Sequence, residues 1–199
     1  MSDHYFSSRP AAGGRQRTIQ FSAWGHDLEL RTSSGVFSAD RLDKATAILL
    51  TRTEPPRAGS TVLDLGCGWG PIACALAVAS PEAAVWATDV NERALDLTRL
   101  NAGSLGVELH AELPTDVPAG QRFDAIWSNP PIRIGKAALH ELLLEWLPRL
   151  QPGGRAHLVV GKNLGADSLQ RWLTEQGWPT DRVASEQGFR VLVAHGPQM

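Results

Sequence analysis

Three glycines at alternate positions follow a short apolar run at residues 61–65 and precede a helical pattern; they are Gly66, Gly68 and Gly70. Glycine lets a ligand approach the backbone where a side chain would collide with it. The N-terminus of the following helix favours an anion such as a carboxylate, whereas Asp64, at the tip of the expected strand, favours a cation. The pattern predicts a site for a ligand with both an ammonium and a carboxylate, as on the amino-acid tail of S-adenosyl-L-methionine.

A second acid, Asp89, directly follows the next apolar run, residues 84–88. A carboxylate at the carboxyl end of that strand can hold both hydroxyls of a ribose through paired hydrogen bonds. The alternative is that Asp89 caps the helix that begins near Asn91. The GxGxG spacing of the glycines differs from the GxGxxG of dinucleotide-binding loops, which argues against the rival class of nucleotide-dependent oxidoreductases.

An Asn-Pro-Pro-Ile stretch at residues 129–132 follows the expected strand 123–127 and so lies at the same carboxyl edge of the sheet. Two prolines remove two N–H donors and leave carbonyls exposed. The amide oxygen of Asn129 and the carbonyl of Pro130 can accept both hydrogens of an NH2 group and aim its nitrogen at an electrophilic methyl. A strong general base is then unnecessary, because the proton becomes acidic once the methyl has arrived. The alternative is a rigid loop in which Asn129 only forms a turn.

The elements that position these residues follow from the periodicity of the chain. Apolar runs alternate with helical patterns, which predicts a parallel sheet covered on both faces. Two last apolar runs flank a Glu-Gln-Gly turn at 186–188 and predict a closing hairpin with an antiparallel last strand. The expected strands are 61–65, 84–88, 107–110, 123–127, 155–160, 182–185 and 189–194, and the expected helices are 71–80, 92–103, 136–150 and 166–176.

The first third of the chain precedes this alternation. Alternating residues at 18–32, broken at 25–27, predict an N-terminal hairpin. A helix is expected over 40–53, capped by Ser38 or Asp40. Residues 1–17 carry three arginines against one acid and read as a flexible basic arm, or equally as a solvated terminus. We expect residues 18–199 to form one domain, with the hairpin and helix in 18–55 and the core in 60–195.

Composition limits the class of protein. Of 199 residues, 43% are hydrophobic and 20% charged, which is typical of one globular domain. A run of about 18 apolar residues and a signal-peptide pattern are both missing, so we expect a cytoplasmic protein and no membrane partner. The net charge of -2 provides no global basic field, so any RNA contact must be local. Cys67 and Cys74 lack partners at metal spacing, so we expect buried free thiols and no metal.

The motifs at residues 60–195 resemble those of the class I S-adenosylmethionine-dependent methyltransferases. The resemblance implies a Rossmann-like α/β fold: a seven-stranded, mostly parallel sheet with an antiparallel last strand, here preceded by the hairpin. It also implies S-adenosylmethionine as the cofactor. The glycine loop would hold the methionine part, and the acids after the next two strands would hold the adenosine. The implied cofactor-binding residues are Asp64, Gly66, Cys67, Gly68, Gly70, Asp89, Val90, Glu112 and Asn129.

Other segments, at 34–43, 128–136 and 188–192, are similar to one group, the ribosomal small-subunit guanine-N2 methyltransferase C-like family of small methyltransferase domains. The likeness extends to residues 5–7 and 18–21. It implies methylation of guanine N2 in 16S ribosomal RNA, with that RNA or the small ribosomal subunit as partner and Asn129 and Pro130 as catalytic residues. Implied substrate-binding residues are Phe37, Pro131, Ile132, Arg133 and Lys136. Larger members carry a second, degenerate half, which aids substrate binding.

The sequence departs from this family at two positions. Ile132 replaces a stacking aromatic, so apolar contact, or stacking on Arg133 or Phe37, would have to substitute. Ala45 replaces the glycine of an Asp-x-Gly-Thr segment at 43–46. Phe37 is equally well explained as an apolar anchor, and Arg133 and Lys136 as plain surface charge. Another amine substrate (adenine N6, a protein glutamine or a small molecule) and a cofactor-binding protein without turnover remain open, and the oligomeric state is unknown.

Overall fold

The computed structural model describes residues 16–33, 40–130 and 135–197. An N-terminal hairpin consists of β1 (Gln16–Ala23) and β2 (His26–Ser33), which pair antiparallel over their whole length. Its turn lies at Trp24 and Gly25, both with positive φ, a conformation that matches the twist of the two strands. The predicted hairpin is therefore confirmed, although its turn begins one residue before the predicted break.

The main sheet has seven strands in the order β5-β4-β3-β6-β7-β9-β8. Neighbours from β5 to β7 are parallel, and β9 is antiparallel to both β7 and β8. The predicted mostly parallel sheet with an antiparallel last strand is thus confirmed. The strands are β3 (Thr61–Leu65), β4 (Ala84–Thr88), β5 (His110–Glu112), β6 (Phe123–Ser128), β7 (Leu150–Gly161), β8 (Thr180–Glu186) and β9 (Phe189–His195).

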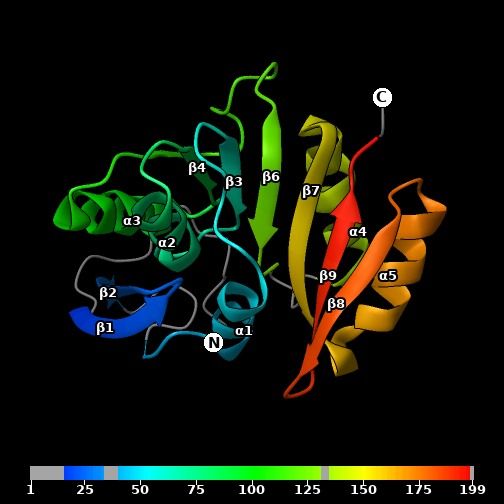
Figure 1. Ribbon diagram of the computed structural model, residues 1–199, viewed down its shortest axis with the longest axis horizontal. Helices are drawn as coiled ribbons and strands as arrows, with labels where there is room; N and C mark the ends of the chain where they lie inside the picture. Colours follow the sequence, from blue (N-terminus) through cyan, green and yellow to red (C-terminus); the bar gives the residue numbers. More distant parts are fainter. Residues whose placement is uncertain (1–15, 34–39, 131–134, 198–199) are drawn as a thin grey trace, which may run out of the picture.

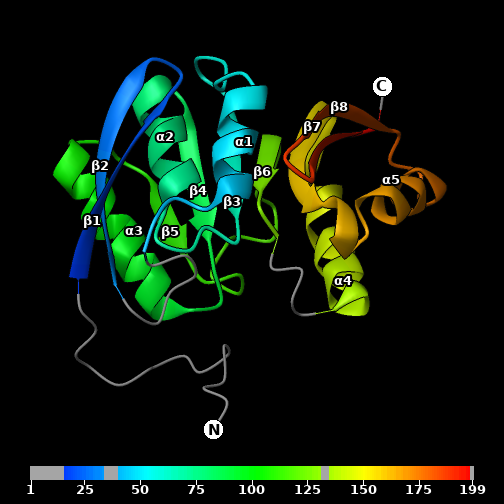
Figure 2. The ribbon, with the colours of Figure 1, turned by 90° about the horizontal axis from the view of Figure 1, so that it is seen from below.

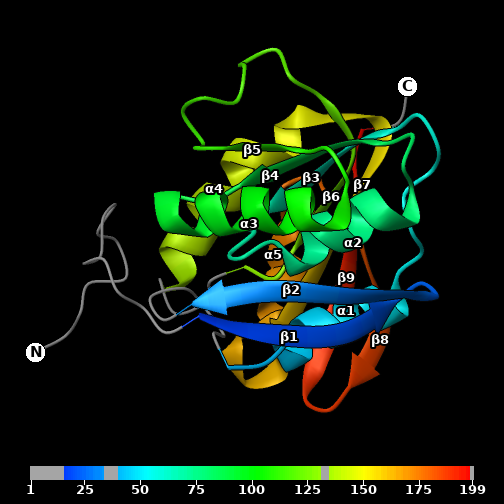
Figure 3. The same ribbon diagram turned by 90° about the vertical axis from the view of Figure 1, so that its left-hand side faces the viewer.

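Helices cover both faces of this sheet, as Figures 1 and 2 show. Alternate side chains of each buried strand point to opposite faces, so Val62 joins one hydrophobic core and Leu63 the other. The first core includes α1, α2, α3 and the hairpin, which lies along α2 and α3 (Figure 3). The second includes α4 and α5. Their bounds are α1 (Lys44–Arg52), α2 (Pro71–Ala79), α3 (Glu92–Leu105), α4 (Lys136–Trp146) and α5 (Ala166–Glu175), with short 3-10 helices η2 (Leu147–Arg149) and η3 (Lys162–Leu164).

Two predicted elements, the helix 40–53 and the strand 107–110, begin later than expected. The first helix is capped by Asp43, whose Oδ2 accepts hydrogen bonds from the amides of Ala45 and Thr46, so the prediction of Ser38 or Asp40 as cap was wrong. Residues 107–109 are not strand. The amide of Val107 donates to the carbonyl of Ala102 and closes the end of α3, so β5 starts only at His110.

A further boundary change lies after α4, where the predicted helix 136–150 ends early in η2 and β7 already begins at Leu150. The predicted basic arm also ends earlier, because Gln16 and Arg17 belong to β1, and its residues 1–15 lie outside the described part of the chain. No helix in the described ranges is long and apolar enough to cross a membrane.

Candidate active site

The glycine loop connects β3 to α2 at the carboxyl edge of the sheet. Gly66, Gly68 and Gly70 have φ of 78°, 58° and 84°, in the left-handed region that favours glycine. The loop is fixed to the neighbouring strand, because the amides of Gly66 and Cys67 both donate to the carbonyl of Thr88, at 2.9 and 3.0 Å. Its conformation thus depends on the end of β4 as well as on its own glycines.

A threonine of α3, Thr98, supports the same loop from behind. Its hydroxyl donates to the carbonyl of Gly68 at 3.1 Å and lies 3.7 Å from the sulfur of Cys67. A Cβ on Gly70 would come within 2.8 Å of that hydroxyl oxygen. The Cys67 side chain therefore faces α3, and burial raises the pKa of its thiol. A ligand above the loop would meet the backbone of Cys67 and not its sulfur.

Asp64 lies beneath the loop and is completely buried. One carboxylate oxygen, Oδ2, accepts a hydrogen bond from the amide of Ala73 in α2 at 2.9 Å. Within the described chain the other oxygen, Oδ1, is buried without a partner. Desolvation on burial raises the pKa of Asp64 to about 8. An unpaired buried acceptor of this kind is costly unless a donor or a cation reaches it.

Asp89 follows β4 and joins two backbone amides. Its Oδ2 accepts from Gly68 and its Oδ1 from Asn91, both at 2.9 Å. Burial raises the pKa of this carboxyl as well. The cap of α3 is Asn91, whose side chain accepts from the amide of Arg93, so the alternative role of Asp89 as helix cap is wrong. The next residue, Val90, exposes 53% of its surface.

Glu112 ends β5, where it pairs with Thr88 of β4. The Thr88 hydroxyl donates to the Glu112 carbonyl at 2.9 Å, while the Glu112 side chain is 38% exposed and lies 3.8 Å from the Arg99 guanidinium. The acids predicted for the cofactor therefore stand at the carboxyl ends of three adjacent strands, in β3, directly after β4 and in β5.

Asn129 follows β6 on the other side of β3. Ser128 ties the two strand ends together, since its hydroxyl donates to the carbonyl of Leu65 at 2.7 Å. The side-chain nitrogen of Asn129 donates to Oδ2 of Asp43 at 2.8 Å and to the hydroxyl of Thr46 at 3.0 Å. Asn129 is half-buried and Pro130 buried. Asn129 thus keeps its amide oxygen, Oδ1, out of these two bonds.

Some of the predicted site residues are not among those that the structure describes. Phe37, Pro131, Ile132 and Arg133 lie outside the described residues. Lys136 is exposed at the first position of α4. The departure at Ala45 is accommodated, because this residue is 3% exposed and its amide donates to the cap Asp43.

Four residues that hold the site were not predicted: Asp43, Thr46, Thr98 and Asn101. Asn101 of α3 is fully buried; its Oδ1 accepts from the amide of Arg31 at 2.7 Å, and its Nδ2 donates to the carbonyls of Arg31 and Trp69, both at 2.8 Å. It joins the hairpin to the glycine loop. A polar residue among apolar helix positions was the available signal, but its partners are distant in sequence.

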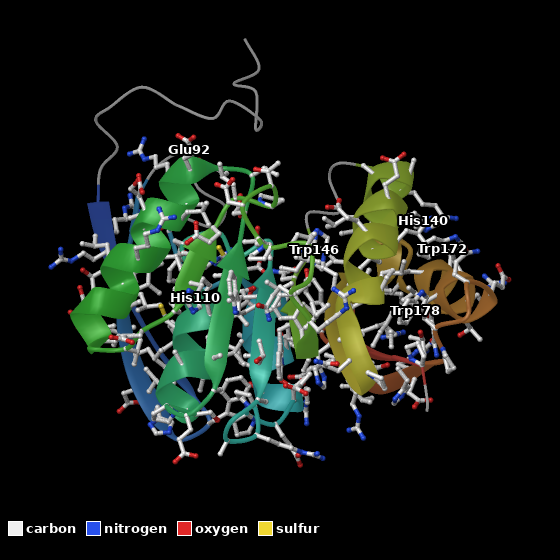
Figure 4. The ribbon with its side chains drawn as sticks, turned by 90° about the horizontal axis from the view of Figure 1, so that it is seen from above. Glu92, His110, His140, Trp146, Trp172 and Trp178 are labelled. Carbon is white, nitrogen blue, oxygen red and sulfur yellow. The ribbon has the colours of Figure 1, made fainter. Side chains whose placement is uncertain are left out.

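Other chemically suggestive residues lie away from this edge. Figure 4 shows His140, Trp172 and Trp178 grouped on the side of α4 and α5. His140 stacks on Trp172 with ring centroids 3.5 Å apart, and Arg149 covers the buried ring of Trp146. These contacts are packing. Across residues 16–33, 40–130 and 135–197, no group of three or more His, Cys, Asp or Glu could hold a metal ion.

The glycine loop after β3, the acids after β4 and in β5 and the strand order define a protein with the class I methyltransferase fold. Residues 27–193 match the family described as the methyltransferase small domain, and the chain belongs to this family.

Comparison with known proteins extends this assignment. The chain is 32% identical to a Bacillus subtilis protein, uncharacterized YbxB, over 98% of both chains. It is 36% identical to ribosomal RNA small subunit methyltransferase C of Klebsiella pneumoniae, covering 90% of this chain and 52% of that protein. In structure it is similar to the Thermus thermophilus 16S rRNA N2 methyltransferase RsmC in complex with AdoMet and guanosine, with a TM-score of 0.81 and 24% identity over 94% of this chain. The chain thus spans about half the length of these two methyltransferases.

Proposed function

We propose that this protein transfers a methyl group from S-adenosylmethionine to the exocyclic N2 amine of a guanine in small-subunit ribosomal RNA. The observation that carries the proposal is the Asn129 side chain, which uses both hydrogens within the protein and keeps an acceptor oxygen at the carboxyl edge of the sheet. The names of the methyltransferase C relatives support small-subunit ribosomal RNA as the substrate, and the name of the guanosine-bound N2 methyltransferase supports the choice of guanine. The partner would be the RNA or the small subunit, in the cytoplasm.

The residues of the site fit the proposed cofactor. The three glycines have left-handed φ values, which side chains rarely tolerate, and the unpaired Oδ1 of Asp64 would be an acceptor for the ammonium side of the loop. Asp89 and Glu112 would face the ribose and adenine, beside the exposed Val90. When bound, S-adenosylmethionine supplies a methyl carbon whose bond to the sulfonium sulfur breaks, with the electron pair going to sulfur, as the new N–C bond forms.

The chain itself would bind and orient the acceptor. The lone pair of a base amine is delocalised into the ring, and two acceptors on its hydrogens favour the pyramidal nitrogen that can attack. The amide oxygen of Asn129 and the carbonyl of Pro130 would supply them. After the N–C bond has formed, the nitrogen is cationic and loses one proton to solvent, so no strong base is needed in the site.

Tritiated-methyl transfer tests this proposal. Purified protein is incubated with labelled S-adenosylmethionine and either small subunits or naked 16S RNA, and the product is digested to nucleosides. We expect label in N2-methylguanosine, and a loss of about 100-fold in rate for Asn129→Ala, typical of removing one orienting acceptor. Gln176→Ala, an exposed amide after α5, is the matched control. Label in adenine or protein glutamine, or tight cofactor binding without transfer, would overturn the assignment.

A further inference from the structure

An asparagine amide can present either of two opposite groups to a substrate. Its oxygen accepts hydrogen bonds and its nitrogen donates them, and the two ends have nearly the same shape. An amine substrate needs the oxygen, because an NH2 group facing the amine would set donor against donor. Some other group must therefore decide which end of Asn129 faces the substrate.

Two neighbours of Asn129 fix the orientation of its amide. Asp43 Oδ2 and Thr46 Oγ1 receive the two hydrogens of Nδ2, at 2.8 and 3.0 Å. A carboxylate accepts hydrogen bonds and does not donate them, so an inverted amide would place its oxygen against the Asp43 oxygen at the same short distance. The inverted orientation is therefore disfavoured by Asp43, while Thr46 adds the second acceptor.

Both neighbours are themselves held in place. Asp43 is the cap of α1, and its Oδ2 also accepts the amides of Ala45 and Thr46, at 2.9 and 3.3 Å. Thr46 is 4% exposed. The helix that carries them packs against β7 and β9. The two acceptor oxygens are therefore held in place relative to the sheet.

We propose that Asp43 and Thr46 are positioning residues that lock Asn129 as an acceptor and thereby restrict the site to substrates that present an N–H group. This inference rests on the proposed function and deepens it. It assigns to the cap of α1 a role in choosing the acceptor, in addition to its role in starting the helix.

Two substitutions separate these roles. Asp43→Ser keeps a good helix cap but shortens the side chain away from Asn129. Thr46→Val keeps the shape of the side chain and removes the acceptor oxygen. The matched control is Thr51→Val on the same helix, because Thr51 is exposed and its hydroxyl donates to the helix carbonyl of Ala47.

The measurements are kcat and KM for the RNA acceptor, the Kd of S-adenosylhomocysteine and the Tm. We expect kcat to fall about tenfold for each variant, with the cofactor Kd and the Tm close to those of Thr51→Val. In an Asn129→Ala background, Thr46→Val should cause no further loss, because the group that it orients is gone. A purely structural role would lower the Tm and act equally in both backgrounds.

A second readout does not depend on turnover. The side-chain NH2 resonances of Asn129, assigned from their absence in Asn129→Ala, should exchange slowly with solvent and become faster in Thr46→Val and Asp43→Ser. Unchanged kcat in both variants, with activity lost in Asn129→Ala, would overturn this inference and leave the proposed function intact. Full activity in Asn129→Ala would instead overturn the role of Asn129 itself.

Discussion

Asp89 and Gly68, 21 residues apart, are joined by a 2.9 Å hydrogen bond from the Gly68 amide to the Asp89 carboxylate. The bond connects the acid after β4 to the glycine loop after β3, where the two strands lie side by side (Figure 1). The residue proposed to hold the ribose thus also shapes the loop proposed to hold the methionine. The two parts of the cofactor site are therefore coupled through one side chain.

Replacing this carboxylate by an amide should weaken cofactor binding. Asp89→Asn keeps the size of the side chain but turns one of its two oxygens into a donor, which opposes either the Gly68 or the Asn91 amide. We expect the Kd of S-adenosylhomocysteine to rise about tenfold or more in calorimetry. Asp96→Asn on the surface of α3 should bind normally. Equal affinities for the two variants would contradict the coupling.

Asp64 should make the free protein sensitive to pH. Its pKa rises from 3.8 to about 8 on burial, so the folded state holds the proton more tightly than the unfolded state. The contribution of Asp64 to the stability of the cofactor-free protein is therefore fully present below about pH 4. It is lost as the pH rises towards about 8. Asp64→Asn removes the titratable carboxyl and keeps an oxygen for the Ala73 amide.

In thermal unfolding without cofactor, the Tm of Asp64→Asn minus that of the natural protein should grow as the pH rises from about 4 to about 8. The variant should also lose cofactor binding. A difference that stays constant over this range would show that Asp64 does not carry the predicted proton.

Two glycines of the loop should differ in their tolerance of a methyl group. Gly68 and Gly70 both have positive φ, so alanine at either costs about 1–2 kcal/mol of unfolding free energy. A Cβ on Gly68 meets nothing within 4 Å, whereas one on Gly70 meets the stiff Thr98 side chain at 2.8 Å. We expect Gly70→Ala to lose a further 1–3 kcal/mol or so in urea denaturation. Equal losses would argue that Thr98 moves aside.

Removing the Asn101 side chain should loosen the hairpin. Asn101→Ala leaves the amide and carbonyl of Arg31 and the carbonyl of Trp69 without these partners. A loss of roughly 3 kcal/mol in unfolding free energy is expected. Limited proteolysis should also cut the β1–β2 hairpin sooner. Ser104→Ala, on the exposed side of α3, is the control, and cleavage at the same rate in both variants would contradict the role of Asn101.

Local properties of the chain were sufficient for much of the fold. The apolar run before Gly66 predicted β3, because a strand buried on both faces has a continuous apolar pattern. The acids Asp64 and Asp89 were found because each occurs where such a run ends. The cap of α1 was misjudged, since several residues able to cap lie within a few positions of each other.

The sequence by itself determined the succession of strands and helices along the chain and the identity of the glycine loop, because periodicity and left-handed turns depend on neighbouring residues. Only the tertiary structure decided which residues hold that loop and the Asn129 amide. Asp43 meets Asn129 across 86 positions, and Asn101 meets Arg31 across 70. These pairs form because α1 and the hairpin pack on one face of the sheet, and no local pattern specifies which polar atoms such packing brings together.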